Sequence, residues 1–114
     1  MRLPLHNSNR TMQLVNKTCL KGVPGLYQQD NKGDQAIVYL KFFMESWTWM
    51  LTELDQQNGQ AFGMVYSSMC PEGELGYFSL MELSQLQGSV GQGVERDRYW
   101  DRKPLCEVKN PCNS

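Results

Sequence analysis

One stretch of the sequence, residues 73–83, reads GELGYFSLMEL and decides the fold predicted for this chain. It joins a short run of strand-forming residues to the start of a helix. Ser79 stands where a helix cap belongs, and Glu82 follows it at the capping-box spacing. The stretch therefore predicts a strand over residues 75–78 that runs directly into a helix over residues 80–87.

Three stretches upstream predict further strands. Residues 36–44 are rich in β-branched and aromatic side chains, and residues 46–55 and 61–69 continue the strand pattern. Asn58 and Gly59, between the last two stretches, are a strong hairpin signal. We expect an α+β fold: a small, mostly antiparallel sheet of three to five strands with helices packed on one face.

Three details of this expected fold can be compared with a structure. In residues 36–44 the alternate side chains form one core face, and they are Ala36, Val38, Leu40, Phe42 and Met44. The residues from about 11 to 21 have a weak helical period and predict a second helix. Residues 70–73, which include a proline and a glycine, predict a turn before the strand over 75–78.

The length of 114 residues predicts a single domain over residues 1–114, with a loose N-terminus over 1–10, a folded core over 11–106 and a tail over 107–114. A chain of this size buries roughly two-thirds of its unfolded surface, which is enough for a core. No apolar run approaches the ~20 residues that a membrane helix needs. The first residues also lack the apolar segment of a secretory signal. The sequence therefore predicts a cytoplasmic protein with no membrane segment.

Charge is distributed unevenly although the net charge is only −1. Residues 1–29 carry +4, residues 30–92 carry −6 and residues 93–114 carry +1. One interpretation is that each element solvates its own face. The other is an acidic face and a basic face, suited to binding a charged protein surface. Direct nucleic-acid binding is not expected, because such proteins usually have a clear basic excess.

The four cysteines do not form a C-x-x-C pair, which makes a zinc site unlikely by spacing. Two disulfides are arithmetically possible. Without a secretion signal, the sequence favours reduced thiols. The cysteines are Cys19, Cys70, Cys106 and Cys112.

The most unusual polar run, residues 95–102, reads ERDRYWDR. In an extended segment its arginines and tryptophan share one face and its acids the other. The run is either a segment tied to the sheet by ion pairs, a recognition surface for a protein partner, or a surface that stacks on nucleobases. The candidate partner-binding residues are Glu95, Arg96, Asp97, Arg98, Tyr99, Trp100 and Arg102.

Two tryptophans, Trp47 and Trp49, are two positions apart and so face the same way in a strand. Such a pair is usually part of the core. The alternative is an aromatic surface or a cage for a ligand.

Four carboxylates flank the predicted strands and meet at one end of the sheet if the second and fourth strands lie close. Converging carboxylates bind divalent cations or transfer protons, whereas acids at strand ends are more often simply solvated. The four are Glu53, Asp55, Glu72 and Glu74. No catalytic motif, metal-ligand spacing or cofactor motif is found, so we expect no catalytic residue, no metal and no cofactor.

The chain resembles the bacterial domain-of-unknown-function family twenty-nine fifty-eight over about residues 11–108. The motifs that carry the resemblance are WTW-x3-E-x-D (47–55), FG-x-V (62–65), ELGYFSL-x-EL (74–83), VERD (94–97) and KPL (103–105). The resemblance implies a small cytosolic protein carried by plasmids, phages and integrative elements, often near anti-restriction genes. It implies no settled activity, so it assigns no catalytic role.

Three functions follow as hypotheses. The leading one is a non-enzymatic interaction protein of a mobile genetic element, an inhibitor that blocks a host defence nuclease complex (a CRISPR effector or restriction enzyme) by steric and electrostatic means. The second is a small metal-assisted hydrolase or nucleotide-processing enzyme that uses Glu53, Asp55, Glu74 and Glu95. The third is a single-stranded nucleic-acid-binding module. The sequence leaves the oligomeric state open.

Overall fold

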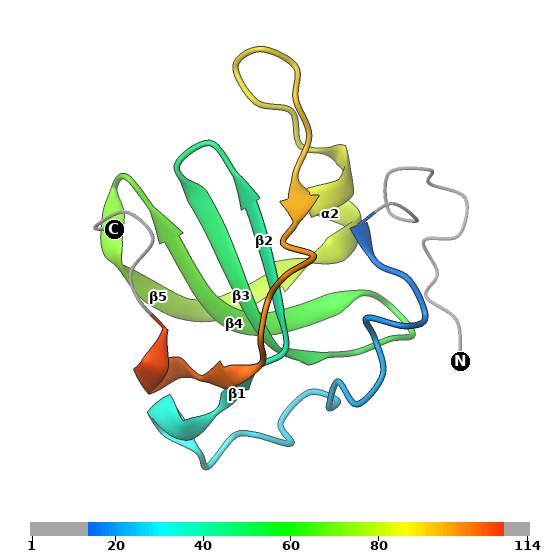
Figure 1. The fold of residues 1–114 in the computed structure, drawn as a ribbon, viewed down its shortest axis with the longest axis vertical. Helices are drawn as coiled ribbons and strands as arrows, with labels where there is room; N and C mark the ends of the chain where they lie inside the picture. The colour runs from blue at the N-terminus through cyan, green and yellow to red at the C-terminus, as the bar shows by residue number, and fades with distance from the viewer. Residues whose placement is uncertain (1–13, 109–114) are drawn as a thin grey trace.

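A five-stranded antiparallel sheet with the strand order β5-β4-β3-β2-β6 forms the centre of the computed structural model, which describes residues 14–108 (Figure 1). Its strands are Leu40–Met44 (β2), Trp47–Leu54 (β3), Gln60–Ser67 (β4), Cys70–Ser79 (β5) and Glu95–Arg96 (β6). A second, two-stranded sheet pairs Ile37–Val38 (β1) with Lys103–Pro104 (β7). The helical elements are Leu80–Gln85 (α2) and the 3-10 helices Gly33–Gln35 (η1) and Leu105–Glu107 (η2).

The fold is mostly β, and the prediction of an α+β fold with helices packed on one face is wrong. The α-helix α2 has only six residues. It ends before residue 87 because Leu86 is extended (φ −71°, ψ 143°) and the chain then forms an isolated bridge between Gln87 and Gly93. Within residues 14–108, no helix is long and apolar enough to cross a membrane.

The second predicted helix, over residues 11–21, is replaced by turns from Val15 onward. Asn16 explains part of this, because its side-chain oxygen accepts the N–H of Cys19 at 2.8 Å and holds the chain in a turn. Residues 11–13 of that prediction lie outside the described residues, as do the predicted loose N-terminus and residues 109–114 of the predicted tail.

The stretch that links β5 to α2 begins its helix as predicted. The hydroxyl oxygen of Ser79 accepts the N–H of Glu82 at 3.3 Å, so Ser79 is the helix cap. The strand before it is much longer than predicted, however, and the predicted turn over residues 70–73 is wrong. Gly73, with φ +82°, lies where the pairing register between β4 and β5 shifts, so its positive φ belongs to a bulge. The chain turns earlier, between Ser67 and Cys70.

Two hydrophobic cores cover the two faces of the large sheet. All five side chains predicted for the core face of residues 36–44 are buried. The three in β2 join a core with Trp49 and Leu83, whereas Ala36 and Val38 join a second core with Met50 and Tyr66. The face divides because β1 is not a strand of the large sheet and pairs with β7 instead.

Residues 25–32 form a loop that two buried polar side chains tie to β1 and β3. The carboxylate of Glu53 accepts the N–H of Tyr27 at 2.9 Å and that of Gln29 at 2.7 Å. The side chain of Gln29 donates to the carbonyls of Ile37 and Thr52 and accepts the N–H of Ile37. These contacts hold Tyr27 at φ +72°, a conformation that non-glycine residues rarely adopt.

Candidate functional site

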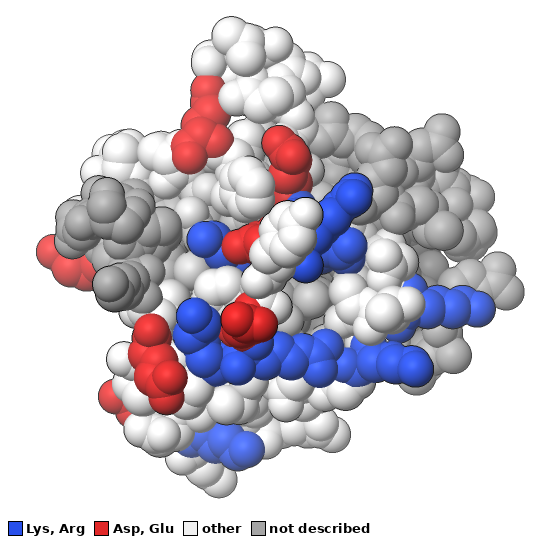
Figure 2. Space-filling model, viewed as in Figure 1, with Lys and Arg blue, Asp and Glu red and all other residues white. Residues whose placement is uncertain are grey.

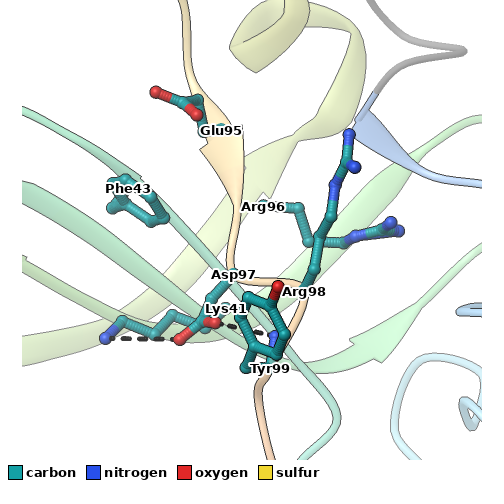
Figure 3. Close-up of a pocket in the computed structure, with 7 residues that line it drawn as sticks. All are labelled: Lys41, Phe43, Glu95, Arg96, Asp97, Arg98 and Tyr99. Atoms are coloured by element: carbon teal, nitrogen blue, oxygen red, sulfur yellow. Dashed lines mark hydrogen bonds and ion pairs between the residues drawn. The ribbon is translucent and has the colours of Figure 1, made fainter.

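Most of the predicted partner-binding residues surround a shallow groove of about 510 Å³ over β6 and the segment that follows it (Figure 3). We call this groove the arginine–tyrosine surface. Its lining residues are Lys41, Phe43, Glu95, Arg96, Asp97, Arg98 and Tyr99. The pairing of β6 with β2 places it at one edge of the large sheet.

Asp97 fixes the backbone turn that carries the exposed aromatic residue of this surface, Tyr99. One oxygen of Asp97 accepts the N–H of Tyr99 at 2.9 Å, and the other lies 3.9 Å from Nζ of Lys41. The N–H of Asp97 also donates to the carbonyl of Lys41 at 2.9 Å. These contacts fix the turn after β6, and the side chain of Tyr99 is 92% exposed.

The two arginines keep hydrogen-bonding capacity that the described residues do not use. In Figure 3 the side chains of Arg96 and Arg98 extend away from the carboxylate of Asp97. Neither forms an ion pair within residues 14–108, and one guanidinium nitrogen of Arg96, Nη1, is buried without a hydrogen-bond partner there. A buried donor without a partner costs about 1–3 kcal/mol. Nη1 of Arg96 is out of reach of a partner, whereas the exposed side chain of Arg98 can donate to an acceptor outside the described residues.

Lysine and arginine side chains gather across the middle of the face that Figure 2 shows, with carboxylates set among them. Residues 95–103 supply four of these bases and three acids. A surface of mixed charge of this kind selects a partner by complementarity, and it does not attract every polyanion.

The structure gives Trp100 and Arg102 packing roles. The indole N–H of Trp100 donates to the carbonyl of Val38 at 2.9 Å, and Nζ of Lys103 lies 4.8 Å from its ring centroid. Arg102 donates to the carbonyls of Cys19 and Lys21, and its guanidinium lies 4.8 Å from the ring centroid of Tyr39. The predicted alternation of faces ends at the turn in which the N–H of Trp100 donates to the carbonyl of Asp97 at 3.4 Å.

The rings of Trp47 and Trp49 stack on each other, with centroids 5.8 Å apart and planes 14° apart. Trp49 is buried, and Trp47 is 44% exposed. Both line an apolar groove of about 360 Å³ beside α2. A cage needs rings that face a common space, whereas these two rings face each other.

The four predicted carboxylates do not come together. Glu53 of β3 is buried opposite Phe62 of β4, whereas Glu74 of β5 pairs with Val65, which lies farther along β4. Asp55 accepts the N–H of Gln57 at 2.9 Å, and Glu72 is exposed. Within residues 14–108, no three His, Cys, Asp or Glu side chains are grouped closely enough to hold a metal ion.

Sequence reasoning missed two residues of the arginine–tyrosine surface. Lys41 and Phe43 belong to β2 and point away from its buried side chains. The alternation along residues 40–44 already indicates an outer face for both. What it does not show is that a segment more than fifty residues later, Glu95–Arg96, pairs beside them.

Three cysteines, Cys19, Cys70 and Cys106, are free thiols in the described part of the chain. Cys112 lies outside the described residues. The thiol of Cys19 lies 3.3 Å from the carbonyl oxygen of Asn16, inside the turn described above.

The structure defines a small, mostly β protein with exposed arginine and tyrosine side chains at one edge of its large sheet. The chain belongs to the family described as protein of unknown function (DUF2958), whose model matches residues 10–108. The resemblance found in the sequence is thereby confirmed. No curated protein and no solved structure matches the chain significantly.

Proposed function

We propose that this protein is a non-enzymatic interaction protein that binds a protein partner through the arginine–tyrosine surface. The observation that carries the proposal is the exposed ring of Tyr99, which lines one groove with the exposed side chain of Arg98 and follows a turn that Asp97 fixes. Tyrosine and arginine are enriched among the residues that dominate binding energies. Tyrosine offers a large contact area and has only two side-chain torsions to order when a partner binds.

The partner that fits this surface is an acidic protein surface with room for an aromatic ring. The family resemblance implies a protein carried by plasmids, phages and integrative elements. A host defence nuclease complex is therefore the first class of partner to test. Binding beside its nucleic-acid or assembly site would inhibit such a nuclease by steric and electrostatic blocking.

Two other functions are less well supported. A single-stranded nucleic-acid binder needs an uninterrupted basic path, whereas Glu95, Asp97 and Asp101 lie among the arginines. A metal-assisted hydrolase needs converging carboxylates, and the register of β3, β4 and β5 separates them.

The test is a pull-down from host lysate with mass spectrometry, followed by binding and cleavage assays on the recovered nuclease. We expect the wild-type protein to bind and to protect a phage or plasmid. The double variant Arg98→Glu/Tyr99→Ala should bind at least about tenfold more weakly, since it removes both anchors. Lys32→Glu/Met69→Ala, two exposed changes elsewhere, should bind normally.

Recovery of no defence protein together with no protection would overturn the proposal, as would equal binding by the two variants. A nucleic-acid function would show itself as binding to single-stranded oligonucleotides that weakens steeply with salt. That result would replace the proposal.

A further inference from the structure

The strand β5 ends the large sheet on the side opposite to the arginine–tyrosine surface. One edge of β5 pairs with β4, and within the described residues 14–108 the sheet has no strand beyond it. In an antiparallel ladder, alternate residues direct their N–H and C=O groups away from the paired strand. Within residues 14–108, no loop or second sheet supplies a backbone hydrogen bond to residues 71–78. The outer edge of β5 therefore presents unused donors and acceptors.

Only the first part of this edge carries features that prevent strand pairing. Pro71, Glu72 and the bulge at Gly73 all lie in residues 70–73, and proline, charge and bulges are the usual protections of an edge strand. From Glu74 to Ser79 the pairing with β4 is regular. These six positions match the usual length of a strand, so they can serve as a template for another one.

Exposed aromatic and apolar side chains accompany this regular part. Leu75 and Tyr77 lie on the same face and are each 52% exposed. The ring of Tyr77 packs edge-on against Phe62, with centroids 5.0 Å apart. A side-chain hydrogen bond to Tyr27 raises the pKa of Tyr77, and Tyr27 is itself 64% exposed.

The conformation of Tyr27 is held from inside the protein. Its φ of +72° persists because Glu53 accepts its N–H, as described above. Strained residues that the surrounding structure fixes in this way are frequent at binding sites. The two tyrosines therefore form a fixed platform beside the edge. On the opposite face, a Cβ added at Gly76 would meet no atom within 4 Å, so a partner side chain has room to cross there.

The charge of this half of the sheet specifies the partner. Residues 47–79, which span β3 to β5, contain four Asp and Glu and no Lys or Arg. Glu72 and Glu74 are both exposed on β5. A second copy that paired its own β5 here would bring four glutamates into one interface, which like-charge repulsion disfavours. A basic segment is attracted instead.

We propose that residues 74–79 of β5 bind an extended segment of a partner protein as an additional strand, and that this segment alternates lysine or arginine with apolar side chains. Main-chain hydrogen bonds along the edge supply affinity. Glu74 and the exposed side chains of Leu75 and Tyr77 supply specificity for alternate side chains of the segment. This site is separate from the arginine–tyrosine surface, because β5 and β6 are the two opposite ends of the sheet.

The test begins with a phage-displayed library of random twelve-residue peptides selected on the wild-type protein. The library is counter-selected on the variant Leu75→Lys/Tyr77→Lys, which puts two positive charges on the edge. We expect enriched peptides that alternate basic and apolar residues.

The best peptide, made synthetically, should shift the amide signals of residues 74–79 in NMR spectra. It should bind the variant at least about tenfold more weakly. Met81→Lys/Val90→Lys, with the same added charge on exposed residues outside β5, should bind it normally.

A second form of the experiment leaves the protein unchanged. N-methylation of alternate peptide amides removes the donors that face one edge, and binding should be lost for one of the two alternation patterns and kept for the other. Enrichment of acidic peptides, signals that shift elsewhere, or equal binding of both N-methylated patterns would overturn the proposal. So would self-association of the wild-type protein in sedimentation experiments that Leu75→Lys/Tyr77→Lys abolishes, because the edge would then serve a second copy.

Discussion

Glu53 is a buried carboxylate whose two oxygens both accept backbone N–H groups, from Tyr27 and Gln29. Glu53→Gln keeps the shape but turns one acceptor into an NH2 group that faces an N–H donor. We expect this change to lower the free energy of unfolding by about 1–3 kcal/mol. Urea denaturation measures it. Glu74→Gln, on the surface, should change the value by less than about 0.5 kcal/mol. Equal effects of the two changes would show that the buried contacts do not stabilise the loop.

Glu45, at the turn between β2 and β3, gives a pH dependence at the scale of one residue. Hydrogen bonds from the hydroxyl and the N–H of Ser89 lower the pKa of its carboxyl group. The contact therefore contributes fully to the stability of the fold above the ordinary carboxyl pKa. This contribution is lost as the pH falls through the lowered pKa. In Ser89→Ala, NMR titration of the Glu45 carboxyl should give a higher pKa than in the wild-type protein. An unchanged pKa would contradict this origin of the shift.

Residue types alone misled the sequence analysis of the acids. Glu53 and Asp55 were interpreted with Glu72 and Glu74 as a group that could converge at one end of the sheet. Sequence spacing cannot show that the loop over residues 25–32 reaches back to cover Glu53. It also cannot show that the hairpin register separates Glu53 from Glu74.

At the scale of the strands, substitution of two paired glycines in the β4–β5 hairpin by alanine should have very different effects on stability. A Cβ at Gly63 would lie 1.8 Å from the carbonyl oxygen of Met50, so β3 and β4 would have to separate. We expect Gly63→Ala to lower the free energy of unfolding by at least about 3 kcal/mol. Gly76→Ala, its cross-strand partner, meets open space and should change that energy by less than about 1 kcal/mol. Chemical denaturation of both variants measures the difference, and similar losses would contradict the close packing.

The elements that the sequence predicted well are those that a local period determines. Alternation identifies the buried side chains of β2, and a capping pair identifies the start of α2. The errors occur where one residue type serves two structures. Gly73 was interpreted as part of a turn, but it forms a bulge inside β5. The six residues of α2 were expected to continue, but the bridge between Gln87 and Gly93 ends the helix.

At the scale of the whole molecule, the uneven charge of the sequence becomes a difference between the two ends of the sheet. The strands β3, β4 and β5 contain no lysine or arginine, whereas β2 and β6 carry Lys41 and Arg96. Sequence counts gave the segments and their signs correctly. They could not reveal that the strand order places β5 and β6 at opposite edges of the sheet.

The pairing of β1 with β7 has a consequence for how the protein is made in the cell. Val38 can pair with Lys103 only after the whole chain between them has been synthesised. Contacts between residues so distant in sequence slow folding, because a long loop must close first. The second core, which joins Ala36 and Val38 to Leu105, therefore stays incomplete until Leu105 has emerged from the ribosome.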